Sequence, residues 1–176
     1  GAEGIGLFRS EFIYLQSNTL PTEEEHFAAY SRIARAAFPS EVYIRTIDIG
    51  GEKSLPQLNI EKEPNPALGM RAIRFSLWNR DLFKTQLRAI LRASVYGQVR
   101  LMFPLISGIQ EVTAARRILE EVKADLHREG HDFNPDIPVG LMIEVLCAVL
   151  SGGATSTEVG GLHNLDRPMN TSQLFL

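Results

Sequence analysis

The 176 residues are 44% hydrophobic and 22% charged, a balance that predicts one globular domain and excludes a disordered protein. The net charge of −3 argues against nucleic acid as a partner, and no apolar stretch reaches the roughly 18 residues that membrane insertion needs. The single cysteine, Cys147, excludes an internal disulfide framework, and the first residues lack the features of a signal peptide. These features favour a cytoplasmic protein.

The first predicted strand covers residues 5–8 and ends directly at Arg9. A helix follows, because Thr22 and Glu25 have the spacing of a capping box, and it ends at Pro39. The sequence thus opens with a strand, an arginine at the end of that strand, and a helix.

The second predicted strand, residues 42–46, carries Arg45 inside an apolar run. A buried guanidinium is costly unless an anion meets it. That anion is either Asp48, in a structural ion pair that closes the strand end, or a bound ligand. The glycine pair 50–51 and Lys53 come next, and the bare glycine backbone would let a ligand approach closely.

The middle of the sequence repeats the order of helix and strand. A helical region begins at Pro64 and holds Arg71, and Asn79 marks a break before another helix. Gly97 closes that helix, and residues 99–103 form the third predicted strand.

The last regular segments follow the same order. Ser107 and Gln110 have the spacing of a capping box, and they begin a long amphipathic helix that ends at Gly130. A fourth strand covers residues 138–145 and has an acid, Glu144, at its end.

Alternating strands and helices, with nearly continuous apolar strands, indicate a parallel sheet covered by helices. The first strand lacks the glycine pattern of dinucleotide-binding folds, whereas a (β/α)8 TIM barrel places its working residues at the C-terminal ends of its strands. We therefore predict an α/β fold in which residues 1–150 form about the first four strand–helix units of a partial barrel. Residues 151–176 form an atypical tail with no strand run before 174–176. Four strands would leave both sheet edges open.

The candidate site combines arginines with a carboxylate. Arg9 and Arg45 end the first two strands, Arg71 lies at a nearby helix start, and Glu144 ends the fourth strand. Arginine forks match phosphate and carboxylate oxygens, and Mg²⁺ accepts a few acidic ligands plus substrate oxygens and water. This set indicates a small, highly anionic substrate bound with a metal, in phosphoryl-transfer or enolate chemistry.

Several segments, in the same order, resemble enzyme I of the bacterial phosphotransferase system, the phosphoenolpyruvate–protein phosphotransferases. The resemblance covers about residues 1–150 and identifies the chain as the first half of the C-terminal, phosphoenolpyruvate-binding barrel of that family. The matching segments are 4–12, 20–25, 44–53, 65–74, 86–94, 101–104 and 140–144.

The resemblance implies a role for each matched residue. Arg9, Arg45 and Arg71 correspond to arginines that bind phosphoenolpyruvate, and Glu144 corresponds to the first of two Mg²⁺ ligands. In the family, the phosphoryl group passes to a histidine on a separate N-terminal domain and then to the carrier protein HPr. The family's barrel forms homodimers.

Other parts of the family's site have no match in this sequence. These are the segment with the second metal ligand, the proton-donor cysteine and the phosphohistidine, and Cys147 lies too early to be that cysteine. No catalytic residue is therefore assigned, and we expect this chain to be inactive alone. We interpret Trp78 as a packing anchor. The histidines lack metal-ligand spacing, so we expect them on the surface: His26, His127, His131 and His163.

Three alternatives stay open. The nitrogen-branch paralogue of enzyme I would have the same chemistry, and a half barrel could instead be a non-catalytic association module. A metal-dependent aldolase or lyase would also place a glutamate at a strand end but does not explain three arginines. Pyruvate phosphate dikinase and phosphoenolpyruvate synthase fit segment 48–53 less well.

Overall fold

A computed structural model describes residues 4–15, 19–50, 69–142, 144 and 173–175. Within this part of the chain, strands and helices alternate as the sequence predicts. In chain order the elements are β1 (Ile5–Arg9), α1 (Glu11–Leu15), α2 (Glu23–Ala37), β2 (Glu41–Arg45), α3 (Ile73–Trp78), α4 (Arg80–Ala93), the 3-10 helix η1 (Ser94–Tyr96), β3 (Gln98–Phe103), α5 (Ile109–Glu129), β4 (Val139–Met142) and β5 (Gln173–Phe175).

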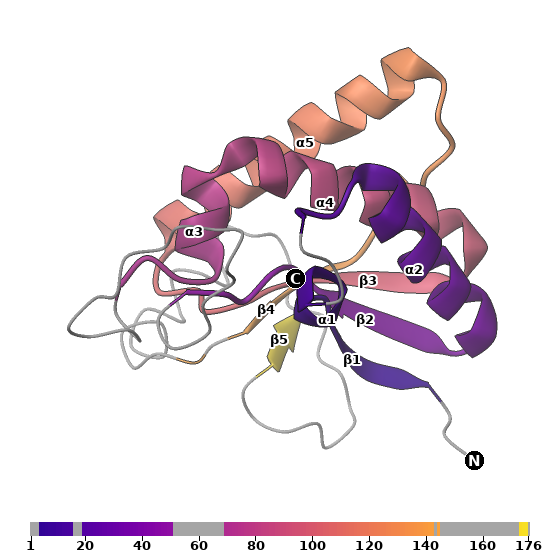
Figure 1. The fold of residues 1–176 in the computed structure, drawn as a ribbon, viewed down its shortest axis with the longest axis horizontal. Coiled ribbons are helices and arrows are strands. Elements are labelled where there is room, and N and C mark those ends of the chain that lie inside the picture. Colours follow the sequence, from indigo (N-terminus) through magenta and orange to yellow (C-terminus); the bar gives the residue numbers. More distant parts are fainter. Residues whose placement is uncertain (1–3, 16–18, 51–68, 143, 145–172, 176) are drawn as a thin grey trace.

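The first four strands are parallel, and their order in the sheet is their order in the sequence. Helices α2, α3, α4 and α5 lie together on one face of the sheet (Figure 1). A doubly wound sheet would reverse its strand order and carry helices on both faces. The described fold is therefore an open part of a singly wound barrel, which confirms the predicted fold class.

Alternate residues of the strands build two apolar regions. Val42 and Ile44 of β2 belong to the large core between the sheet and the helices, together with Leu101 of β3. Tyr43 and Met102 belong to a small cluster with Met142, because successive side chains of a strand point to opposite faces. Arg45 has the same parity as Tyr43, so it lies on the face opposite the helices.

The helix starts confirm one of the two predicted capping boxes and the predicted break at Asn79. Thr22 caps α2 in a full capping box, with its N–H 2.7 Å from a Glu25 carboxylate oxygen, and Asn79 separates α3 from α4 and caps the latter. The capping box predicted for Ser107 was wrong. Gly108 is the N-cap of α5 without a side-chain cap bond, and the carboxylate of Glu111 accepts the Ser107 N–H at 2.6 Å instead.

The fourth strand corrects two expectations. It spans only Val139–Met142, and its outer edge pairs antiparallel with β5, so that Leu141 lies opposite Leu174. The end of the chain therefore returns to the sheet and covers the outer edge of β4, which was expected to be open, and the sheet stays open with β1 and β5 at its two edges. Cys147 and the tail apart from β5 lie outside the described residues, and the domain boundary at residue 150 stays a prediction.

Two predictions about burial were wrong, one for a histidine and one for a tryptophan. His26 is 1% exposed and lies four and eight residues before Tyr30 and Ala34, on the buried side of α2. Trp78, expected to be a packing anchor, is 69% exposed at the end of α3. His127 and His131 are exposed, as expected, and His163 lies outside the described residues. None of the described helices has the length and apolarity to cross a bilayer.

Candidate functional site

Arg9 and Arg45 lie side by side at one edge of the sheet. They are the last residues of β1 and β2, and they are register partners in the parallel pair. Because aligned residues of parallel strands share a face, both arginines belong to the same face and the same carboxyl edge. Arg9 is exposed, whereas Arg45 is 4% exposed. The sequence predicted this placement from the strand ends.

Two buried carboxylates meet Arg45. Its Nη2 forms an ion pair with Oε1 of Glu11, the first residue of α1, and lies 3.4 Å from Oδ2 of Asp48. Its Nη1 lies 3.9 Å from the sulfur of Met142. Sequence reasoning left a choice between Asp48 and a ligand, and the structure places Asp48 there together with Glu11. The signal for Glu11 was the abrupt change from an apolar strand to charged residues directly after Arg9.

Asp48 also binds the third arginine of the predicted set. Arg71 donates from Nε to Oδ1 of Asp48 at 3.0 Å and from Nη2 to Oδ2 at 3.3 Å. This contact is the main cause that raises the pKa of Arg71 above its usual value, and the charges of Glu144 and Glu11 raise it further. The Arg71 side chain is 26% exposed, so one of its faces is accessible to solvent.

Arg71 is brought to Asp48 by close backbone packing. Gly50 has a φ of +114°, and a Cβ on it would lie 2.4 Å from the carbonyl oxygen of Met70 and 2.8 Å from Cα of Arg71. Ala72 donates its N–H to the carbonyl of Ile49 at 2.9 Å. The bare backbone at Gly50 therefore admits the chain itself, where the sequence predicted a ligand. Arg71 precedes α3 and is not within a helix, while Gly51 and Lys53 lie outside the described residues.

Glu144 follows β4 at the same edge and is exposed. Its Oε2 accepts the N–H of Leu105 at 3.1 Å, and Leu105 has a φ of +53°, which is unusual for a residue with a side chain. The neighbouring N–H of Ile106 donates to the carbonyl of Met142 at 3.2 Å. The loop after β3 thus holds the segment that carries Glu144.

The described acidic residues limit how a metal ion could bind. Among the described residues, no three or more histidine, cysteine, aspartate or glutamate side chains form a cluster that could hold a metal ion. Asp48 and Glu11 are engaged by arginines, so the exposed carboxylate of Glu144 is the donor that fits. One carboxylate suits Mg²⁺, which takes most of its ligands from water and substrate oxygens, and does not suit an all-protein cage.

The arrangement offers hydrogen-bond donors to an anion. Arg9 and one face of Arg71 are accessible, and Nε of the buried Arg45 has no hydrogen-bond partner among the described residues. A buried donor without a partner is costly, and an anionic ligand could satisfy it. The carboxylates of Asp48 and Glu11 fix Arg45 and Arg71 in place before any ligand arrives.

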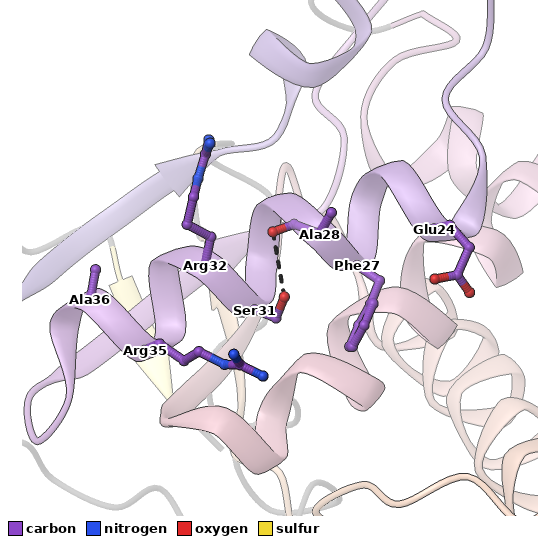
Figure 2. Close-up of a pocket in the computed structure, with 7 residues that line it drawn as sticks. All are labelled: Glu24, Phe27, Ala28, Ser31, Arg32, Arg35 and Ala36. Carbon is purple, nitrogen blue, oxygen red and sulfur yellow. Dashed lines mark hydrogen bonds between the residues drawn. The ribbon is translucent and has the colours of Figure 1, made fainter.

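A separate hollow of about 810 Å³ lies on the outer side of α2. Figure 2 shows its lining residues, all from that helix, among them Arg32, Arg35 and Phe27. The guanidinium of Arg35 already lies 4.0 Å from the centre of the Tyr96 ring. The hollow contains none of the predicted site residues, and the edge of the sheet is the better candidate.

Comparison with known proteins gives consistent matches. The family model described as PEP-utilising enzyme, PEP-binding domain, matches residues 1–162. The phosphoenolpyruvate-protein phosphotransferase of Staphylococcus aureus is 50% identical over 145 residues, which are 82% of this chain and 25% of that protein. The protein of the same name from Priestia megaterium is 48% identical over 159 residues, 90% of this chain and 28% of that protein. The chain thus spans about a quarter of the length of these curated relatives.

Proposed function

We propose that this chain binds phosphoenolpyruvate within a phosphoenolpyruvate–protein phosphotransferase. The premise is that the chain belongs to the PEP-utilising enzymes, as their PEP-binding domain. The complete enzyme would pass the phosphoryl group through one of its own histidines to HPr, in the cytoplasm, as a homodimer. The observation that carries the proposal is the gathering of Arg9, Arg45, Arg71 and Glu144 at the carboxyl edge of one sheet.

Phosphoenolpyruvate carries a phosphate and a carboxylate on three carbons, so it needs several donors within a small space. Arg9 and the accessible face of Arg71 would supply forked donors to these oxygens, and Arg45 would add its unused Nε. Charge spreads over the phosphoryl oxygens in the transition state, and arginines already fixed by carboxylates stabilise it without reorganisation.

Glu144 is the described residue that we assign to Mg²⁺. Its carboxylate is exposed at the same edge, and the Leu105 N–H orients one of its oxygens. When bound, the ion would neutralise charge on the phosphoryl group. The protein's own part is to hold this carboxylate next to the arginines.

The test is a chimera in which this chain replaces the 145 matching residues of the Staphylococcus aureus relative. We expect the chimera to release pyruvate from phosphoenolpyruvate and to label HPr, and Glu144→Gln to raise the Mg²⁺ concentration needed by about tenfold or more. A folded chimera that neither releases pyruvate nor labels HPr would contradict the proposal.

The 176-residue chain by itself serves as the matched control. With Mg²⁺ and labelled phosphoenolpyruvate we expect neither labelled protein nor pyruvate, since no histidine here matches the family's acceptor. Stoichiometric labelling of the chain would show that it holds its own acceptor.

A further inference from the structure

A line of buried hydrogen bonds runs from α2 to the segment that follows β2. The Ile47 N–H donates to Oε1 of Gln86 at 3.0 Å, and Nε2 of Gln86 donates to the Tyr30 hydroxyl at 3.0 Å. The hydroxyl in turn lies 3.1 Å from Nδ1 of His26. The side chains of Gln86, Tyr30 and His26 are at most 1% exposed, so each bond is made away from water.

The direction of the first two bonds along this line is fixed by its first member. A backbone N–H can only donate, so the oxygen of the Gln86 amide faces Ile47 and its nitrogen faces Tyr30. The Tyr30 oxygen accepts the bond from Gln86, and the donor in the bond between Tyr30 and Nδ1 of His26 depends on the tautomer of the ring. Burial lowers the pKa of His26 to about 4, so the ring is neutral near pH 7.

The bond to Ile47 reaches the centre of the candidate site. Ile47 lies between Arg45 and Asp48, and its side chain is buried in an apolar cluster with Ile49. The carboxylate of Asp48 holds both arginines, so the backbone position at residue 47 sets where these charges lie. Gln86 is the described side chain that fixes this backbone from the helix layer.

We propose that Gln86 is a positioning residue for phosphoenolpyruvate binding: its amide, anchored on Tyr30, holds the Ile47 N–H and thereby aligns Asp48, Arg45 and Arg71 for the substrate. This inference rests on the proposed function. Gln86 does not touch the substrate, and its effect reaches the site through one backbone amide.

A purely structural role would also make Gln86 important, because a buried N–H without an acceptor destabilises the fold. Ser94 provides the matched control for that loss. Its hydroxyl is buried and accepts the N–H of Asn134 at 2.8 Å, at a place that none of the site residues contacts. Ser94→Ala thus removes a side-chain acceptor from a backbone N–H, as Gln86→Met does, but away from the site.

The experiment measures KM and kcat for phosphoenolpyruvate, together with thermal stability, in the chimera. We expect Gln86→Met to raise KM by about tenfold or more, with kcat within about threefold. Ser94→Ala should lower the melting temperature as well but leave KM within about twofold of the parent chimera. The inference is wrong if the KM of Gln86→Met stays within about twofold of the parent chimera. It is also wrong if KM rises in Gln86→Met and in Ser94→Ala in proportion to the fall in melting temperature.

A second variant covers a failure of Gln86→Met to fold. Gln86→Glu keeps an oxygen for the Ile47 N–H, so its KM should stay closer to the parent than that of any variant without an acceptor. A KM of Gln86→Glu as high as that of Arg71→Ala would overturn the inference. An inactive parent chimera, by contrast, would refute the proposed function, so the two failures are distinct.

Discussion

The carboxylate of Asp48 binds Arg71 at two points, with Nε 3.0 Å from Oδ1 and Nη2 3.3 Å from Oδ2. Its Oδ2 also lies 3.4 Å from Nη2 of Arg45. One buried carboxylate thus joins Arg45, at the end of β2, to Arg71, which lies 23 residues after Asp48 in the sequence. The geometry of the candidate site depends on this shared contact.

Asp48→Asn should therefore affect both stability and activity. The amide keeps the size of the side chain but loses the charge that two arginines share, and breaking a buried pair costs about 3 kcal/mol. Urea denaturation of the chain measures this loss, and kcat/KM of the chimera should fall by about tenfold or more. Asp125→Asn is the control: its partner Arg128 is exposed, so stability should change by less than about 1 kcal/mol.

Arg45→Ala should lower the phosphoryl-transfer rate of the chimera by about 10²–10³-fold, because it removes a preorganised donor and leaves Glu11 and Asp48 without it. Arg45→Lys should restore only part of this rate, since lysine lacks the planar fork. Steady-state kinetics with phosphoenolpyruvate measures both variants. Parental turnover by the alanine variant would contradict the role proposed for Arg45.

Gly50→Ala should destabilise the chain by about 2 kcal/mol or more, because φ at this position is +114° and the new Cβ would collide with Met70. The same collision should displace Arg71 and weaken phosphoenolpyruvate binding. Gly6→Ala is the matched control, since a Cβ there meets nothing within 4 Å. Equal melting temperatures for the two variants would show that the close approach at Gly50 is not required.

The buried ring of His26 should make stability depend on pH. Its pKa is about 4 in the folded chain and 6.5 in a model peptide, so the unfolded chain binds more protons between these values. Its contribution is therefore complete above pH 6.5 and is lost as the pH falls toward 4, by about 3 kcal/mol in all.

Urea denaturation at several pH values, compared with His26→Asn, isolates this contribution. Asparagine can still accept the Tyr30 hydroxyl but does not titrate, so the carboxylates common to both chains cancel in the difference. Parallel pH profiles for the two chains would show that His26 titrates normally.

The sequence predicted the parts of the site that depend on local order. Arg9, Arg45 and Glu144 were placed at the carboxyl edge because each follows an apolar strand, and the structure puts them there. The contacts that Asp48 makes with Arg71 and that Gln86 makes with Ile47 join residues 23 and 39 positions apart. No local pattern encodes such pairs, since they follow from how the helices pack on the sheet.

His26 was within reach of sequence reasoning and was still placed wrongly. Its spacing of four residues from Tyr30 puts it on the apolar side of α2, whereas the polarity of histidine predicts an exposed position. Its partner Tyr30 satisfies the ring nitrogen inside the core. The capping box predicted at Ser107 does not form, because the carboxylate of Glu111, four residues on, accepts the Ser107 N–H in place of Gln110.

The alternation of side chains from Ile47 to Ile49 has a consequence for how this segment can change. Ile47 and Ile49 are buried in an apolar cluster, while Asp48 between them faces the arginines. Inserting or deleting a single residue before Asp48 would shift the alternation by one position. An isoleucine side chain would then face the arginines, and the Asp48 carboxylate would enter the apolar cluster. The segment therefore tolerates replacements of similar shape and rejects any change of length by one.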